Sequence, residues 1–371
     1  MSRPDIGERP EADPGRTLTG LRVAGGLAPG PVGWCDPLGA EVGQVQVMFV
    51  SPEGVEDHPV GAIRPLLARE GGFVWVDVEQ WDEAQEAVLA DHFGFHEMAL
   101  RACRERNHMP ATHAYADHVF VVLHAPEPGA YGHVHLLELD QFIGERFLVT
   151  VHGPLNPEVP LERALEETRS VLHRMESGRF SPVSPMELSY AVVSAVVRRQ
   201  RSAVTAVAEK VATLERRVMA GSFRNPEVFL EEMFLVRHEL LTVRTMAAQT
   251  HDVYARLAHL GRFVRAEDRP LLEDLSDQFD RVRSISDGEK EFLFGVIDLY
   301  QTRITTKMTV AMERLAVLAA VTLPVTALAS IYGMNVIVNE STHWPGLLLV
   351  IAVMVTISGT LLRWTKKQGW W

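Results

Sequence analysis

Cysteine is almost absent from this chain of 371 residues, which contains only Cys35 and Cys103. Two cysteines cannot build a disulfide framework or a cysteine-based zinc site, and their scarcity fits a reducing compartment. The N-terminus also lacks the apolar core of a signal peptide, so we expect no secretory leader.

Sequence motifs of catalysis are lacking as well. The chain has no nucleophile elbow, no Walker loop and no dinucleotide-binding glycine pattern. The stretch His96-Glu97-Met98-Ala99-Leu100 begins like a metalloprotease helix, but it lacks the second histidine that such a helix needs to bind zinc. We therefore predict that the protein is not an enzyme and that it carries no organic cofactor.

Positive charge is scarce over most of the chain. The net charge is −12, and residues from Arg303 onward hold six Lys/Arg against two Asp/Glu, so residues 1–302 carry −16. A body this acidic argues against nucleic acid as a partner. It is compatible with the attraction of cations and equally with plain solubility.

Long apolar runs are limited to two, Leu315–Met334 and Leu347–Leu362, both near the C-terminus. About 20 apolar residues cross a bilayer core as a helix, and Trp344 extends the shorter second run to an interfacial residue. The turn that connects the two runs contains no lysine or arginine. These residues flank the pair of runs instead, as Arg303, Lys307, Arg314, Arg363, Lys366 and Lys367. Because positive residues stay on the cytoplasmic side, we expect a multi-pass protein of the cell membrane with both termini in the cytoplasm.

The rest of the chain divides into segments of different character. Residues 1–43 are rich in Pro, Gly and charge and predict a disordered tail. Residues 44–268 predict a cytoplasmic α/β or α+β domain with a mixed sheet and a helical arm. Strands are expected at 44–50, 73–78, 118–124, 134–143 and 146–151, and helices at 82–93, 97–104, 161–176, 186–219 and 228–260.

A very long helix is expected over residues 269–334, because after Pro270 no proline interrupts the chain until Pro324, inside the first apolar run. It is followed by an outer loop, 335–346, and by the second span with a cytoplasmic tail, 347–371. The helix before this long helix is expected to begin at residues 225 and 226, because Asn225 is a typical N-cap and Pro226 a typical first helical residue.

The long helix carries a stripe of residues at intervals of three and four, which places them on one face. The stripe consists of Asp298, Thr305, Thr309, Met312, Leu315, Ala319, Leu323, Thr326 and Ser330. Two spans cannot enclose a pore alone, so such a stripe could line an axis surrounded by several copies. It could equally be a packing seam between helices, where small residues are favoured.

The outer end of the first run carries the motif Tyr332-Gly333-Met334-Asn335. Three apolar stretches upstream accompany this motif, namely Val74–Val78, His118–His124 and Phe147–His152. A further set of residues lies on the long helix: Leu299-Tyr300, Arg303, Met312, Leu315, Pro324 and Thr326. From about Met48 to Trp371 the chain resembles the CorA family of magnesium transport proteins. The resemblance favours the pore interpretation of the stripe.

The resemblance implies a funnel-shaped homopentamer in a lipid bilayer, with the first spans around the pore. It implies channel-like uptake of Mg²⁺, often also of Co²⁺ and Ni²⁺, driven by the membrane potential. Gly333, Met334 and Asn335 would form the selectivity ring. Mg²⁺ dehydrates reluctantly, so a ring of amide and carbonyl oxygens suits the hydrated ion. Glu340 in the outer loop either concentrates cations or is an ordinary solvated acid.

Two positions depart from the family pattern. Thr309 stands where the family often has Asn. The family's cytoplasmic Mg²⁺ site is matched on one side by Asp274 and Asp277, but the partner position falls near Arg101-Ala102, which offers no carboxylate. Substitutes could come from Asp91, Glu97 or Glu105, or Arg101 could pair with Asp274 and replace the metal.

Two alternatives of function stay open. One is a Zn²⁺ transporter on the same fold, for which His92 and His96, or His133 and His135, have ligand spacing. We expect these histidines to be ordinary surface or sheet residues, and the intact Gly-Met-Asn motif counts against a zinc transporter. The other is a membrane-anchored cytoplasmic sensor that conducts no ion.

Overall fold

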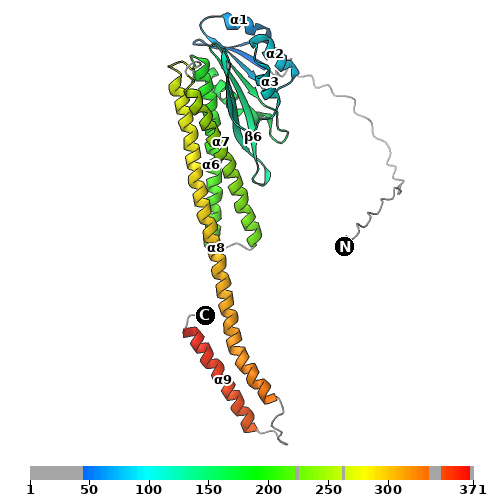
Figure 1. Cartoon of the computed structure of the whole chain (residues 1–371), viewed down its shortest axis with the longest axis vertical. Helices are drawn as coiled ribbons and strands as arrows, with labels where there is room; N and C mark the ends of the chain where they lie inside the picture. Colours follow the sequence, from blue (N-terminus) through cyan, green and yellow to red (C-terminus); the bar gives the residue numbers. More distant parts are fainter. Residues whose placement is uncertain (1–44, 222–224, 261–263, 334–343, 368–371) are drawn as a thin grey trace, which may run out of the picture. The chain divides into compact units, whose positions relative to one another are not determined.

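The computed structural model describes residues 45–221, 225–260, 264–333 and 344–367. Its N-terminal part contains a β-sheet (Figure 1). This sheet has seven described strands in the order β2-β1-β3-β7-β6-β5-β4. The strands are β1 (Val45–Ser51), β2 (Gly54–His58), β3 (Phe73–Val78), β4 (Ala111–Ala114), β5 (His118–Pro128), β6 (Val134–Gly144) and β7 (Phe147–His152). Only the β3–β7 pairing is parallel, so the described sheet is mixed, as expected.

Strands β2 and β4 were not expected from the sequence. Both lie at the edges of the sheet, and their sequences, GVEDH and ATHA, are short and polar. An edge strand is half solvated and is often charged, so it lacks the apolar alternation that marks an inner strand. The two missed strands are therefore those with the weakest pattern, and the short helix α1 (Ile63–Ala68) was not expected either.

Helices cover both faces of the sheet. One face packs against a short 3-10 turn, Val60–Ala62, and against α1 (Ile63–Ala68), α2 (Glu83–Phe93) and α3 (Glu97–Arg104). The other face packs against α5 (Glu166–Glu176) and α6 (Pro185–Ala220). The single helix expected over 161–176 is in fact two, α4 (Leu161–Ala164) and α5, because Leu165 between them leaves helical geometry with φ −99° and ψ 7°.

Three long helices follow, α6, α7 (Pro226–Ala258) and α8 (Arg269–Gly333), and then α9 (Trp344–Lys367). Asn225 caps α7, since its side chain accepts a hydrogen bond from the backbone of Glu227 at 3.1 Å. Gly221 ends α6 in the left-handed region with φ 64°, where a side chain would be strained. The expected long helix is confirmed: α8 has 65 residues and continues through Pro324 over about 97 Å.

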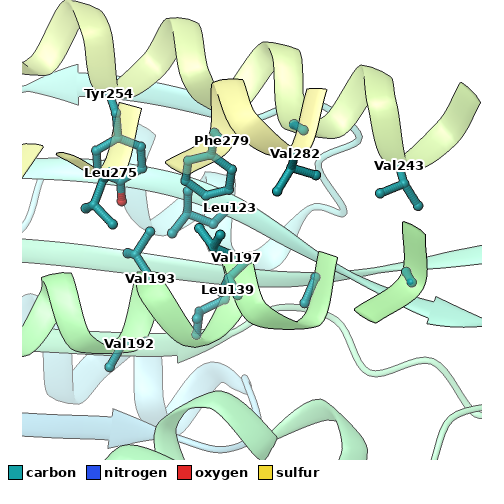
Figure 2. Close-up of a cluster of buried hydrophobic side chains, with 14 of the residues drawn as sticks. Leu123, Leu139, Val192, Val193, Val197, Val243, Tyr254, Leu275, Phe279 and Val282 are labelled. Carbon is teal, nitrogen blue, oxygen red and sulfur yellow. The ribbon is translucent and has the colours of Figure 1, made fainter. Parts of the chain in front are cut away.

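The largest core joins the sheet to the long helices. Figure 2 shows Leu123 and Leu139 of the sheet facing Val193 and Val197 of α6, with Phe279 of α8 above them. Tyr254 of α7 stacks on Phe279 at a ring distance of 5.8 Å. The first half of α8 is therefore part of the core, whereas beyond Tyr300 the only buried residue on the described part of α8 is Val317. The predicted α/β domain followed by long helices and two apolar helices is confirmed.

Candidate functional site

Two described helices, α8 and α9, are long and apolar enough to cross a membrane. In a soluble core helix such a stretch would be buried. Here only 6% of the most apolar window of α8 and 0% of that of α9 are buried. These faces need an apolar surrounding that a single chain does not provide, which is the property of a membrane span.

The nine stripe residues on α8, Asp298 to Ser330, are all exposed in the single chain. The largest among them, Met312, Leu315 and Leu323, are 59%, 64% and 66% exposed. The second span does not cover them: α9 packs against α8 at Val325, which lines a pocket together with residues of α9, and Val317 is the buried residue of this part of the described helix. At about 100° per residue, these two lie roughly 140° from Met312 on either side, on the far face of the helix.

The hydroxyl groups of the stripe are positioned by the helix itself. Thr309 donates a hydrogen bond to the carbonyl of Thr305 at 3.0 Å, and Thr326 donates to the carbonyl of Thr322 at 2.8 Å. Each hydroxyl proton is thus engaged, and the oxygen lone pairs remain available as acceptors. Such oxygens can accept hydrogen bonds from the waters of a hydrated cation.

The outer motif is described only at its start. Gly333 is the last residue of α8 and is exposed. Met334, Asn335 and Glu340 lie outside the described residues, and so does the predicted tail, residues 1–43. The geometry of the selectivity ring therefore stays a prediction.

Asp274 and Asp277, the candidate regulatory acids, lie near the start of α8. Tyr190 of α6 donates its hydroxyl proton to Asp274 Oδ2 at 2.7 Å, and Gln278 donates to the same oxygen at 2.5 Å. The other oxygen lies 3.9 Å from Arg281. Burial, and after it the bond to Asp274, raises the pKa of Tyr190. Asp274 is therefore held by its own chain, whereas Asp277 is exposed and has no hydrogen-bond or ion-pair partner among the described residues.

Tyr190 and Gln278 were not singled out from the sequence. Gln278 follows Asp274 by four residues on a helix, so the helical spacing could have suggested this contact. Tyr190 lies 84 residues away along the chain, and no local pattern could have found it.

The acids that could complete the cytoplasmic Mg²⁺ site on the side opposite Asp274 and Asp277 are partly engaged in contacts with arginine. Arg101 donates to Glu105, the residue that follows α3, at 2.8 Å, which raises the pKa of Arg101, and Asp91 pairs with Arg64 at 3.0 Å. Glu97, in the first turn of α3, is exposed and forms no ion pair within the described part of the chain. Of the three acids, Glu97 is therefore the one most available to a ligand.

Three of the four histidines in these pairs have ordinary roles, whereas Nδ1 of His92 is buried and has no hydrogen-bond partner among the described residues. His96 caps α3 by accepting from the backbone of Met98 at 3.1 Å, and the ring of His133 contacts that of His135 at 4.8 Å. His135 also bonds Asn156 at 2.8 Å. No ready-made group of three or more His, Cys, Asp or Glu stands within metal-binding reach in the described ranges. The pairs thus give the zinc interpretation no support.

Comparison with known proteins matches most of this chain to a protein family. The family model for CorA-like Mg²⁺ transporter proteins matches residues 70–367. YfjQ of Bacillus subtilis is 24% identical over 302 residues, covering 80% of this chain and 89% of that protein. The cobalt/magnesium transport protein CorA of Thermotoga maritima is 21% identical over 335 residues, covering 88% and 92%.

A zinc transport protein, ZntB of Photorhabdus laumondii, is 27% identical, but over 142 residues only, which cover 37% of this chain and 42% of ZntB. Among solved structures, the complete CorA magnesium transporter of Methanocaldococcus jannaschii superposes with a TM-score of 0.72 at 18% identity, covering 88% of this chain and 98% of that one. The two share a fold. Members of the matched family are ion transporters rather than enzymes, and this chain belongs to that family, the CorA-like Mg²⁺ transporter proteins.

Proposed function

We propose that this protein mediates channel-like uptake of Mg²⁺, and also of Co²⁺ and Ni²⁺, along an axis lined by the stripe of α8. One observation carries the proposal: α9 packs on the far face of α8 and leaves the whole stripe, with its hydroxyl groups, uncovered. Polar groups at membrane depth are stable only against protein or water. The uncovered stripe therefore needs partners, and the copies of α8 in a homopentamer are the partners that we propose.

Selection of the ion is assigned to the outer end of α8. The backbone carbonyl of Gly333 and the side chain of Asn335, repeated around the axis with Met334, offer neutral oxygens to the waters of hydrated Mg²⁺. A neutral ring binds weakly enough for the ion to leave, as conduction requires. Glu340 would add a negative charge near the entrance.

The path below the ring alternates polar and apolar positions. Thr326, Thr309 and Thr305 would accept hydrogen bonds from a hydrated cation, whereas Leu323 and Met312 would form apolar constrictions. Rings of this kind can close a pore by dewetting. Asp298, exposed at the cytoplasmic end, would attract cations leaving the pore.

Regulation by internal Mg²⁺ is assigned to Asp274 and Asp277 facing a neighbouring copy. The contacts of Asp274 with Tyr190 and Gln278 occupy one of its oxygens, so it has less capacity for a metal than a free carboxylate. We expect the response to internal Mg²⁺ to be weak for this reason. Glu97 of the neighbouring copy would be the acid on the other side.

The orientation of the protein in the membrane is inferred from the positions of its lysine and arginine residues. Arg303, Lys307 and Arg314 precede the first span, and the lysines of α9, Lys366 and Lys367, end the second. With positive residues on the cytoplasmic side, the sheet domain and both termini lie in the cytoplasm of a cell whose plasma or inner membrane holds the protein.

Ion flux into liposomes tests this function. Purified protein should pass Mg²⁺ and Co²⁺ under an inside-negative potential, with little Zn²⁺ flux. Zn²⁺ flux without Mg²⁺ flux would support the zinc transporter instead. No flux of any ion, from protein that is correctly assembled, would support a non-conducting sensor in which the stripe is a packing seam.

A further inference from the structure

Two carboxyl groups lie next to each other on β6, near the C-terminal end of α3. Glu138 and Asp140 are two residues apart on the strand, so both side chains point to the same face of the sheet. Asp140 pairs with Val122 of β5, which belongs to the core that also contains Cys103 of α3. Glu138 is 8% exposed and Asp140 is 0% exposed. None of the functions considered above uses these two buried acids.

Glu138 holds the segment between α3 and β4, residues 105–110. The backbone N–H of Asn107, in this segment, donates to Glu138 Oε2 at 2.8 Å, and its side-chain amide donates to Oε1 at 2.5 Å. The carbonyl of Asn107 accepts a hydrogen bond from His124 Nε2 at 2.9 Å, and His124 lies directly opposite Glu138 on β5. Both oxygens of Glu138 are therefore engaged, and they tie the segment to the sheet.

Asp140 lacks such partners. Both of its carboxyl oxygens are buried and form no hydrogen bond within the described residues. A buried carboxylate without a hydrogen bond or a cation is far more costly than a buried carboxylic acid, so the group retains its proton. Burial raises the pKa of Asp140 well above its usual range, and the charge of Glu138 adds to this effect. Burial also raises the pKa of Glu138 to about 7, so at neutral pH the pair holds at least one proton.

The groups around the pair supply little positive charge. Arg106 of the segment favours the charged form of the pair, but its guanidinium bonds a backbone carbonyl at 3.1 Å and forms no ion pair among the described residues. Burial, with a smaller contribution from His108, lowers the pKa of His124, so this ring is neutral at neutral pH. Burial raises the pKa of the Cys103 thiol, which is neutral too, and β7 faces the pair with the apolar Val151. A second negative charge on the pair would therefore have no ion-pair partner in the described part of the chain.

We propose that Glu138 and Asp140 form a pH-sensitive switch, in which loss of the last proton from the pair opens the segment 105–110 together with the end of α3. Two like charges in one buried site disfavour each other strongly. Both acids are fixed in β6, whereas the segment has no helix or strand and is exposed from Glu105 to Met109 except for half-buried Asn107. Opening the segment is therefore the easiest way to bring water to the carboxyl groups.

The switch predicts how opening depends on pH. Both carboxyl groups bind protons more tightly in the closed form than in water, so the closed form is favoured at low pH and is lost as the pH rises. Each proton released on opening raises the equilibrium constant of opening about tenfold per pH unit. At least one proton is released, so we expect at least this slope between about pH 6 and about pH 8. The inference does not rest on the proposed transport, because the segment can be observed without ion flux.

Hydrogen exchange of the full-length chain in detergent, followed by mass spectrometry, tests the switch. Peptides that cover residues 105–110 report the amide of Asn107, and the measured exchange rate divided by the intrinsic rate at each pH gives the equilibrium constant of opening. This constant should rise at least about tenfold per pH unit. The segment should also exchange faster than β6 at every pH, because the opening is local.

Asp140→Asn places a neutral amide beside Glu138 and should abolish the dependence on pH. The matched control is Glu145→Gln, which changes an exposed acid directly after β6 and should keep that dependence. A flat profile of the unmodified chain, an equal slope in Asp140→Asn, or exchange of the segment at the rate of β6 would overturn the proposal. The infrared band of a protonated carboxyl group in the unmodified chain gives a test that needs no variant. We expect this band at about pH 7, and its absence would also overturn the proposal.

Discussion

Replacing Arg199 with methionine should destabilise the cytoplasmic domain by about 3–5 kcal/mol, the usual cost of removing one partner of a buried ion pair. Arg199 lies on α6 with a side chain that is 8% exposed. Its guanidinium donates to both oxygens of Glu167 on α5, at 3.0 and 3.1 Å, and to Glu127 on β5 at 2.6 Å. It thereby joins the helix to the sheet and to α5.

The two carboxylates would respond differently to this substitution. Glu127 keeps Arg163 as a partner at 2.8 Å, so it stays paired. The side chain of Glu167 is 4% exposed, and its one ion pair among the described residues is with Arg199; Arg163 and Arg198 act on it only at longer range. Burial already raises the pKa of Glu167, and Arg199 opposes that effect, so the variant should raise the pKa further.

The raised pKa of Glu167 determines how the stability loss of Arg199→Met depends on pH. An acid whose folded-state pKa is raised holds its proton more tightly when folded, so stability is lost as the pH rises through that pKa. The penalty of Arg199→Met should therefore be larger at about pH 8 than at about pH 5. Adding Glu167→Leu should recover most of the loss, because a buried pair replaced by apolar residues is often close to neutral.

Urea-dependent hydrogen exchange of β5 and α5 peptides, in the full-length chain in detergent, measures this effect. Arg201→Met is the control: Arg201 is exposed on the same helix and has no ion pair among the described residues, so its loss should change stability by no more than about 0.5 kcal/mol. Equal effects of the two substitutions, or a penalty that grows on acidification, would refute the reasoning.

Further outcomes concern pH, gating and regulation. Burial raises the pKa of Glu138 to about 7 and that of neighbouring Asp140 well above its usual range, so the thermal midpoint should fall as the pH rises through about 7. Asp140→Asn should flatten that dependence, and an unchanged slope would contradict it. Leu323→Ser or Met312→Ser should raise Mg²⁺ leak at high internal Mg²⁺, and an unchanged closed-state flux would place the gate elsewhere. Mg²⁺ should protect the cytoplasmic domain weakly from protease, and Asp274→Ala should remove this protection; no effect of Mg²⁺ on the unmodified chain would favour a permanent Arg101–Asp274 pair.

The long helices could be predicted from the sequence because their signals are local. Asn225 and Pro226 begin α7, and the gap between Pro270 and Pro324 leaves α8 uninterrupted. The short edge strands β2 and β4 could not be predicted, since polar strands at a sheet edge depend on the neighbour with which they pair.

The functional positions also divide into those that local sequence spacing predicts and those that depend on tertiary contacts. Spacing alone places the stripe residues on one face of α8, but whether α9 covers that face depends on tertiary packing. The contact of Tyr190 with Asp274 joins residues 84 apart in the chain.

The central claim is that the uncovered stripe of α8 faces the ion path, and a cysteine at Leu323 tests it most directly. Cys35 would first be replaced by serine; Cys103 can stay, because it is buried and burial raises the pKa of its thiol. A charged thiol reagent should then reduce Mg²⁺ flux through Leu323→Cys in liposomes. It should spare Leu318→Cys, an exposed position on the flank of the same helix. Equal inhibition of the two variants, or inhibition of Leu318→Cys alone, would contradict the account.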